Sequence, residues 1–467
     1  MPVNSFDNYP MLWKPSLAGE TMPLYKALAR LLEEDIKKGA LKPGDMLPPQ
    51  RELADYLDIN VSTISRAFKL CEQRGLISAT VGKGTYISSD VHVNSRILTA
   101  AKTSGFIEMG PTYPSYRQNM AVIEFVKSML DQSNAADFLR YASPCGSLSQ
   151  KAAGVKWVKK ANLNTTEENL ILSYGGQNAL AAILAALFQP GDRIGTDLCI
   201  YSGMKTLAKM LGIQLVPIQQ ENNAMSPAAL RNYCKNKELK GVYLIPDYQN
   251  PTTHSMSLHT RKEIASIAKE YNIIVIEDAI NSLLRENPSV PIAMLAPDQT
   301  VYVSSTSKAL CAGLRIGFIV SPSVYKSALE LALYNLNLVI SPFNAEIICQ
   351  LIESSMADEI IKDRKAMIVS RNRLTDSILG AYQLLGDAYC YFRWLLLPEG
   401  WTGKTFELCA KNAGVQVYCA ERFAVGNSLV PNAVRIAITA PEDLAELETG
   451  LYILQSILKQ ADDFTML

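Results

Sequence analysis

Apolar residues in the first part of the chain recur with the spacing of short helices. Every third or fourth position is apolar over 24–38, and the same spacing returns over 50–57 and over 62–74, with turn-forming residues between these stretches. The runs LISAT and TYIS then flank the tip VGKG, which predicts two short strands joined as a hairpin. Residues 20–88 are therefore expected to form a winged helix-turn-helix domain.

The pattern changes in the second part of the chain. A polar stretch without clear periodicity, 89–107, predicts a linker. Beyond it, amphipathic helical stretches separate seven β-branched or apolar runs, which are LILS, RIGT, QLVPI, GVYLI, IIVIED, TVYVSS and RIGFIVS. Strands that are apolar on both faces and alternate with helices predict a mainly parallel α/β sheet, so 108–467 is expected to form an α/β domain.

Composition places the whole chain among globular proteins. Of its 467 residues, 48% are hydrophobic and 19% are charged, which excludes a disordered chain. The nine cysteines form no C-x-x-C pair and the three histidines lack zinc-ligand spacing, so no metal site is expected. The first residues do not resemble a signal peptide, and the longest apolar run, 179–188, would cover half a bilayer. We therefore expect a reduced, cytoplasmic protein without a membrane segment.

Charge separates the first domain from the rest. The 45 basic and 45 acidic residues cancel, which excludes a chain-wide nucleic-acid surface but not a small basic module. Between residues 59 and 88, one acid stands against four basic residues, Arg66, Lys69, Arg74 and Lys83. An ordinary helical hairpin would show the same apolar spacing, but this local charge favours DNA binding. The residues that open the third helix can reach a major groove: Ser62, Thr63, Ser65 and Arg66.

Polar residues also follow the predicted strands of the large domain, where open α/β sheets bind ligands. Asp278 ends one strand, Lys308 follows another, and a Gly-Gly-Gln sequence at 175–177 opens a helix. Each alone is more often explained by a turn, a helix cap or a solvated side chain. Together with Tyr201 and Asn250 they supply what pyridoxal 5′-phosphate (PLP) requires: an anion cradle, a ring stack, a donor to the phenolic oxygen, an anion for the pyridinium nitrogen and an amine for the aldehyde.

The first domain resembles the GntR-family winged-helix domain over its whole length, including the sequence LPPQRE and the wing VGKGTYIS. The resemblance implies that six residues contact DNA: Arg51, Ser62, Thr63, Arg66, Lys83 and Gly84. One departure is Asn60-Val61, where the family usually has Ser-Arg, so the operator preference cannot be carried over.

Over about 20–460 the chain resembles the MocR/GabR-type regulators, in which such a domain is fused to a fold-type I aminotransferase-like domain. The resemblance implies a seven-stranded, mainly parallel large domain, a smaller α+β C-terminal domain, a homodimer and PLP as cofactor. It implies that Lys308 forms the internal aldimine, that Asp278 pairs with the pyridine nitrogen and that Asn250 bonds the ring 3′-oxygen.

The same resemblance assigns the remaining site residues. Tyr201 would stack on the ring, and Tyr141 would reach the phosphate from the partner subunit. The phosphate would be surrounded by Gly175, Gly176, Gln177, Ser305, Ser307 and Arg315. Arg435, in AVRIAIT, matches the arginine that binds an amino-acid carboxylate, and a strand arginine paired with an acid is the alternative at that position.

Three departures bear on catalysis. Ile280 stands where the family has a tyrosine that bonds the ring 3′-oxygen, the NPTG turn reads NPTT, and Leu198-Cys199 replaces the usual approach to the stacking aromatic. We expect these changes to affect turnover more than cofactor binding.

The preferred hypothesis is a transcriptional regulator that binds operator DNA as a homodimer. Its aminotransferase-like domain would sense PLP, an amino compound or both through aldimine exchange at Lys308. Two alternatives remain open: a working aminotransferase, amino acid to 2-oxo acid, with an accessory DNA-binding domain, and a regulator that senses PLP itself without an amino ligand.

Overall fold

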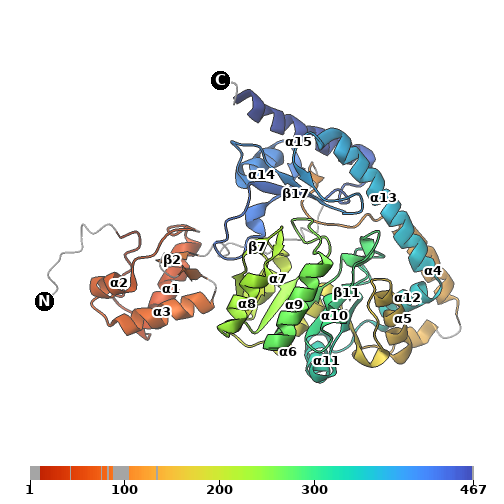
Figure 1. Cartoon of the computed structure of the whole chain (residues 1–467), viewed down its shortest axis with the longest axis horizontal. Helices are drawn as coiled ribbons and strands as arrows, with labels where there is room; N and C mark the ends of the chain where they lie inside the picture. Colours follow the sequence, from red (N-terminus) through yellow and green to blue (C-terminus); the bar gives the residue numbers. More distant parts are fainter. Residues whose placement is uncertain are drawn as a thin grey trace.

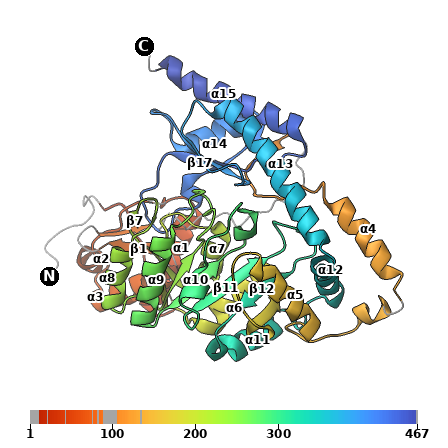
Figure 2. The same cartoon turned by 45° about the vertical axis from the view of Figure 1, so that its right-hand side comes forward.

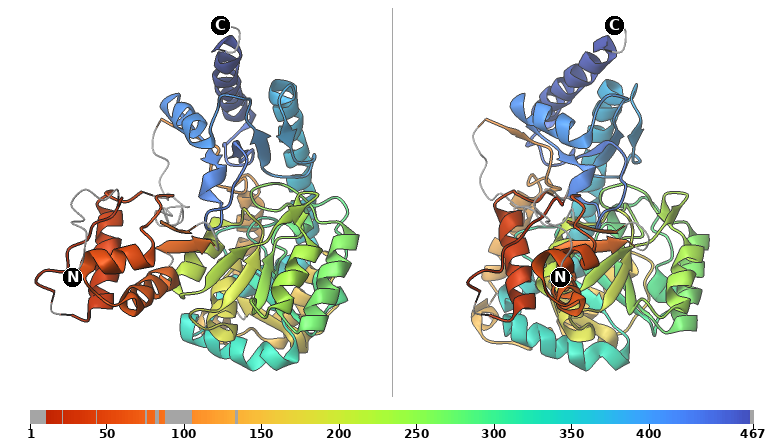
Figure 3. Two further views of the ribbon diagram at one scale, coloured as in Figure 1. Left: turned by 60° about the vertical axis from the view of Figure 1, so that its left-hand side comes forward. Right: turned by 90° about the vertical axis from the view of Figure 1, so that its left-hand side faces the viewer.

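The computed structural model describes residues 11–20, 22–42, 44–74, 76–80, 84–87, 105–132 and 135–464. The N-terminal part contains α1 (Leu24–Lys37), α2 (Gln50–Leu57) and α3 (Val61–Gln73), followed by the antiparallel strands β1 (Ile77–Thr80) and β2 (Gly84–Ile87) (Figures 1 and 3). This is the predicted winged helix-turn-helix. The tip that contains Lys83 and most of the predicted linker, 89–104, lie outside the described residues.

The third helix begins one residue earlier than predicted because Asn60 caps it. The Asn60 side chain accepts a hydrogen bond from the Ser62 backbone N–H at 2.8 Å, which satisfies one of the free donors at the helix N-terminus. The predicted apolar face of α3 is buried against α1 and α2, and it consists of Ile64, Ala67, Phe68 and Cys71. The opposite face of α3 is exposed.

The large domain is built on a seven-stranded sheet. Its strands lie in the order β4 (Leu170–Ser173), β12 (Gly317–Val320), β11 (Thr300–Ser305), β10 (Ile274–Asp278), β9 (Gly241–Leu244), β5 (Arg193–Thr196) and β6 (Gln214–Pro217). These are the seven runs expected from the sequence. Only β12 in this sheet runs antiparallel to its neighbours, so the sheet is mainly parallel, as predicted.

Helices cover both faces of this sheet (Figures 1 and 2). One face packs on α6 (Gly176–Leu187), α7 (Ser202–Met210) and α11 (Ser323–Asn337). The other face packs on α5 (Leu148–Lys159), α8 (Pro227–Lys235), α9 (Leu258–Tyr271), α10 (Ile292–Leu295) and α12 (Pro342–Glu353). Every residue of β10 and β11 is buried, which explains why these strands read as continuous apolar runs.

The smaller C-terminal domain contains the four-stranded sheet β13 (Leu384–Leu385), β14 (Arg393–Leu396), β17 (Ala433–Ile436) and β16 (Tyr418–Cys419). It packs on α14 (Gly403–Asn412) and α15 (Leu444–Phe464). Apart from this sheet, β3 (Ile107–Glu108) pairs with β15 (Val415–Gln416), and β7 (Gln220–Glu221) pairs with β8 (Ala224–Met225). The first strand after the winged domain, β3, therefore pairs with a strand from the C-terminal part of the chain.

Two helices complete the description. α4 (Asn119–Leu130) lies at the edge of the molecule, and α13 (Met356–Leu379) runs from the large domain to the smaller one (Figure 2). The first turns of α13 pack in the core of the large domain, whereas Ile378 and Leu379 pack in the core of the smaller domain. None of the described helices is long and apolar enough to cross a membrane.

Candidate functional site

Lys308 lies just past the end of β11, half-buried between the two domains. Its Nζ donates a hydrogen bond to the backbone oxygen of Thr112 and lies 5.8 Å from the centre of the Tyr391 ring. Loss of hydration, with a smaller contribution from the positive charges of three arginines, lowers the pKa of Lys308 to about 7; these arginines are Arg435, Arg315 and Arg364. In about half of the molecules at neutral pH, Lys308 is therefore an uncharged, nucleophilic amine.

Asp278 ends β10, beside β11, and is only 1% exposed. It accepts a hydrogen bond from the Tyr243 hydroxyl at 2.8 Å and a long one from the Ile280 backbone N–H at 3.4 Å. Burial raises the pKa of Asp278 to about 6, although both hydrogen bonds oppose the rise. A cationic ring nitrogen would supply the counter-charge that this carboxylate lacks.

The start of α6 forms an anion cradle. Gly175 caps the helix with φ of 79°, and a Cβ added there would lie 2.7 Å from Nη2 of Arg315. Arg315 Nη1 donates to the Ser307 hydroxyl at 3.0 Å, and the Ser305 hydroxyl donates to Ser307 at 3.1 Å. Helix N–H groups, two hydroxyls and a guanidinium thus converge, and only glycine leaves room between them.

Tyr201 and Gln177 border the cradle. Gln177 Nε2 donates to the Gly203 carbonyl at 3.2 Å, while its buried Oε1 has no partner among the described residues. A Cβ at Gly203 would lie 2.3 Å from the Tyr201 ring, so this glycine lets the ring and Gln177 approach. Burial raises the pKa of Tyr201 to about 12, and the charges of Asp278, Arg315 and Arg435 act on it as well. The predicted ring-stacking residue therefore stands among the predicted ligand groups.

Arg435, on β17, is 3% exposed and brings the smaller domain into the site. Its guanidinium donates to Asn250 Oδ1 and, at 2.6 Å, to the Gly110 carbonyl, while its Nε has no partner among the described residues. The aromatic rings of Phe392, Tyr418 and Phe423 surround it at 4.6–5.8 Å. Among the described residues Arg435 pairs with no carboxylate, in contrast to the alternative of a strand arginine paired with an acid.

The charges in this region favour an anionic ligand. Three arginines lie near Lys308, and Tyr201 lies near two of them and near Asp278. Burial lowers the pKa of Arg435 to about 10. Buried cations without counter-ions are costly, and two anionic groups would offset that cost. A phosphate at the cradle and a carboxylate at Arg435 would meet this need, so the described residues fit PLP and an amino-acid ligand.

The winged domain exposes most of its predicted DNA contacts. Arg51, Ser62, Arg66 and Gly84 are exposed, and Thr63 is half-buried. The Arg66 guanidinium lies over the Tyr25 ring, 4.4 Å from its centre. Arg74 forms an ion pair with Glu33 of α1 at 3.3 Å, so one of the positive charges counted from the sequence is neutralised locally.

Comparison with known proteins decides the family. Residues 24–87 match the family of bacterial regulatory proteins of the gntR type, and residues 102–451 match the aminotransferase class I and II family. The HTH-type transcriptional regulator YdeF of Bacillus subtilis is 47% identical over 465 residues, covering 100% of both chains. The chain belongs to the MocR-type regulators. In these proteins a GntR-type DNA-binding domain is fused to an aminotransferase-like domain.

A more distant relative matches part of this regulator, and two solved structures share the fold of its aminotransferase-like domain. A pyridoxine biosynthesis transcriptional regulator of Corynebacterium glutamicum, PdxR, is 22% identical over 297 residues, or 62% of this chain and 64% of PdxR. The kynurenine aminotransferase of Pyrococcus horikoshii has a TM-score of 0.70 and 22% identity over 77% of this chain and 92% of its own. LysN of Thermus thermophilus, solved with N-(5′-phosphopyridoxyl)-L-leucine, has a TM-score of 0.69 and 20% identity over 76% and 93%.

Several site residues of this regulator were missed by the sequence analysis. Tyr243 is a tyrosine in an otherwise apolar strand next to β10, and that position was the available signal. Thr112, Arg364 and Tyr391 reach Lys308 from distant segments, and no local motif marks them. Arg364 and Tyr391 also line a small pocket at Lys308, together with Pro114, Leu284, Ile368 and Thr439.

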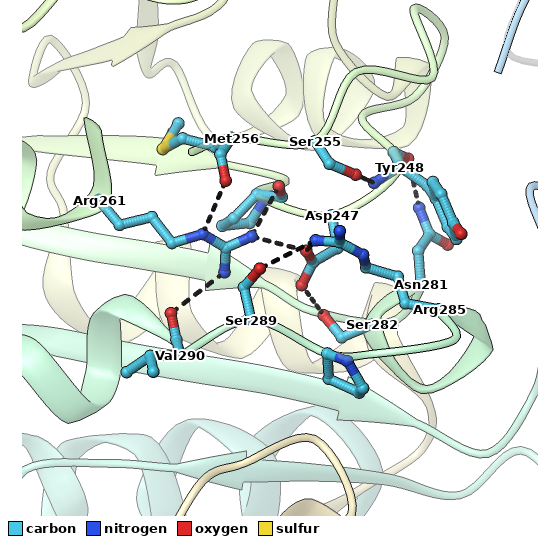
Figure 4. Close-up of polar contacts among 12 residues, drawn as sticks. Asp247, Tyr248, Ser255, Met256, Arg261, Asn281, Ser282, Arg285, Ser289 and Val290 are labelled. Atoms are coloured by element: carbon cyan, nitrogen blue, oxygen red, sulfur yellow. Dashed lines mark hydrogen bonds and ion pairs between the residues drawn. The ribbon is translucent and has the colours of Figure 1, made fainter. Parts of the chain in front are cut away.

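A buried ion-pair network supports the loops that carry Asn250 and Asp278 (Figure 4). Asp247, 2% exposed, accepts hydrogen bonds from Arg261 at 2.6 Å, Arg285 at 2.6 Å and Ser282 at 2.7 Å. Burial alone would raise the pKa of Asp247, but the two arginines and the hydroxyl hold it below its usual value. The network joins the loop after β9 to the loop after β10 and fixes their relative position.

Two residues singled out from the sequence add no polar side chain to the site of one chain. Tyr141 is 83% exposed, as expected of a residue that would act in a partner subunit. Ile280 packs against the start of α6, where a Cβ at Gly176 would lie 3.2 Å from its Cγ2. The place of the family tyrosine is thus taken by an apolar side chain that supplies no donor.

Proposed function

We propose that this protein is a transcriptional regulator whose aminotransferase-like domain binds PLP at Lys308 and senses PLP, an amino compound or both. The observation that carries the proposal is the set of three arginines around Lys308, together with the buried carboxylate of Asp278 at the end of the neighbouring strand. Such a site is stabilised by a ligand with a phosphate and a carboxylate at separate points. This arrangement matches a cofactor phosphate at Arg315 and a ligand carboxylate at Arg435.

The residues would divide the task as follows. Lys308 provides an amine that is uncharged in about half of the molecules at neutral pH, and PLP when bound supplies an aldehyde that such an amine can capture. Asp278 would hold a proton-bearing ring nitrogen, and the Asn250 amide N–H group would donate to the ring oxygen while its Oδ1 stays bonded to Arg435. The phosphate would be bound by the cradle at Gly175, Gly176, Gln177, Ser305, Ser307 and Arg315.

The partners are operator DNA and a second copy of the chain. Exposed polar and basic residues at the start of α3 support DNA contact. Leu139, Tyr141 and Leu148 are large apolar side chains that are mostly exposed, and they surround the segment expected to reach a partner's phosphate site. A homodimer would cover these side chains and hold two winged helices on one operator.

The test uses the full-length protein and DNA selected from a random pool by the protein itself. Adding PLP should produce the absorbance band of a lysine imine, and Lys308→Ala should abolish it. Operator affinity and footprint are then measured at fixed salt, with and without PLP and a panel of amino acids. A persistent band in Lys308→Ala, or affinity and footprint unchanged by every compound, would refute the proposal.

A further inference from the structure

Residues 387–392, which we call the interdomain loop, lie between β13 and β14 of the smaller domain but pack on the large domain. Three of its side chains, Cys390, Tyr391 and Phe392, are buried in the core of the large domain. Leu395, three residues further on in β14, packs in the core of the smaller domain. The interdomain loop therefore joins the two cores, as α13 does, but over a much shorter stretch of chain.

Two hydrogen bonds tie the interdomain loop to loops of the large domain. The Tyr391 hydroxyl donates to Asn281 Oδ1 at 2.7 Å, and both residues are buried. The Tyr248 hydroxyl donates to the Asp387 carboxylate, at 2.7 Å from Oδ1 and 2.9 Å from Oδ2. Asn281 Nδ2 also donates to the Tyr248 carbonyl at 2.9 Å, so the two contacts form one connected set.

This connected set lies between the two halves of the proposed ligand site. Tyr248 lies two residues before Asn250, and Asn281 lies three residues after Asp278. The backbone that receives the interdomain loop thus also places two proposed contacts to the PLP ring. On the other side, β14 follows the loop directly and pairs with β17, which carries Arg435. The loop therefore sets the separation between the proposed ring site and the proposed carboxylate site.

The contact between Tyr248 and Asp387 can be removed without leaving a buried polar group unpaired. Tyr248 is 1% exposed, whereas Asp387 is exposed and can bind water instead. Burial, together with the Asp387 carboxylate, raises the pKa of Tyr248, so its hydroxyl stays protonated and donates. Asp387 also accepts from the backbone N–H groups of Tyr389 at 2.9 Å and Cys390 at 3.1 Å. Tyr248 thus holds the carboxylate that organises the start of the loop.

We propose that Tyr248, Asn281 and Asp387 are positioning residues that hold the smaller domain where Arg435 can bind a ligand carboxylate. This inference rests on the proposed function. Within one chain the proposed PLP contacts all lie in the large domain, whereas the carboxylate site moves with the interdomain loop. Loosening this loop should therefore weaken binding of an amino acid far more than binding of PLP.

The variant Tyr248→Phe tests this in the full-length protein, with L-alanine as the probe amino acid. PLP affinity, measured from the imine band, should stay within about twofold of wild type. The affinity of the PLP-loaded protein for L-alanine, measured from the absorbance change on titration, should fall at least about fivefold. Tyr271→Phe is the matched control, because its hydroxyl bonds Glu270 within the large domain, and it should change neither affinity.

A second measurement uses the cofactor-free protein. Hydrogen exchange at the Tyr389 and Cys390 amides, which donate to Asp387, should be several-fold faster in Tyr248→Phe than in wild type or Tyr271→Phe. Asp387→Ala should weaken L-alanine binding as Tyr248→Phe does, and the double variant should weaken it no further, because both changes remove one contact. Asp387→Asn, which retains an acceptor oxygen, should keep most of the affinity.

The outcomes separate this inference from the proposed function. If PLP produces no imine band in wild type, the two fail together. If the band forms but L-alanine produces no absorbance change, Arg435 binds no amino-acid carboxylate and this inference alone fails. An L-alanine affinity of Tyr248→Phe equal to that of wild type would overturn it. Equal losses of PLP and L-alanine affinity would overturn it as well, because the effect would then be a general loss of structure.

Discussion

Replacing Asp278 by Asn should make the cofactor-free protein more stable at high pH while it loses the cofactor. The pKa of Asp278 is raised from 3.8 to about 6, chiefly by burial. A folded-state pKa above the unfolded one means that the folded protein binds more protons, so the stability associated with this group falls as pH rises between about 4 and about 6. A shift of about two units corresponds to about 3 kcal/mol.

The assay is urea denaturation of the cofactor-free protein at pH 4.5 and pH 8, for wild type and Asp278→Asn. The difference in unfolding free energy between variant and wild type should become more favourable by about 2–3 kcal/mol at the higher pH. Any constant packing effect of the amide cancels in this comparison. Imine formation with PLP should weaken at least tenfold, because the ring nitrogen loses its anion.

Asp197 provides the matched control. It is also buried, burial raises its pKa to about 6, and its partners are Gln220 and the backbone N–H of Met225 rather than site residues. Asp197→Asn should show a similar pH-dependent gain in stability and retain PLP binding. If Asp278→Asn shows no pH-dependent gain, or binds PLP as wild type does, the reasoning about this carboxylate is wrong.

Three further predictions concern other parts of the chain. Gly175→Ala should weaken PLP binding more than tenfold in an absorbance titration, because its Cβ would meet the Arg315 guanidinium. It should also lower the unfolding free energy in urea by about 1 kcal/mol, because φ is positive at this position. Unchanged PLP affinity would contradict the anion cradle. With a pKa of about 7 for Lys308, the rate of PLP capture in stopped flow should rise from pH 6 to 8 and then level off; a rise that continues to pH 10 would show an ordinary lysine. Tyr25→Leu should weaken operator binding about two- to fivefold at fixed salt, since the ring supports Arg66 by about 0.5–1 kcal/mol. If Tyr25→Leu weakens binding equally in the wild type and in an Arg66→Ala background, the prediction is wrong.

Much of the fold could be read from the sequence because burial leaves a strong local pattern. Strands such as β10 and β11 are apolar on both faces, and every one of the seven expected runs became a strand of the same sheet. The antiparallel direction of β12 could not be read, because apolar content does not encode strand direction. The one-residue shift at the start of α3 depends on Asn60, whose capping role was not considered.

The site was predictable only where its residues follow strand ends. Asp278 and Lys308 could be recognised by position along the chain, and the structure brings them together. The partners that contact these two residues could not be recognised from the sequence, because Tyr243 lies 35 residues from Asp278 and Thr112 lies 196 residues from Lys308. Arg364 lies on a helix whose sequence resembles any amphipathic helix, and its role arises only from where α13 crosses the site.

That crossing has a mechanical consequence. α13 has 24 residues, so it is about 36 Å long, and it is embedded in both domain cores. Arg364, near its N-terminal third, is fixed to the carbonyls of Ala309 and Leu310, directly after Lys308. A tilt of about 5° at Arg364 would move the C-terminal end of the helix, about 22 Å away, by about 2 Å. A displacement of the segment after Lys308 would therefore be transmitted along α13 to the smaller domain.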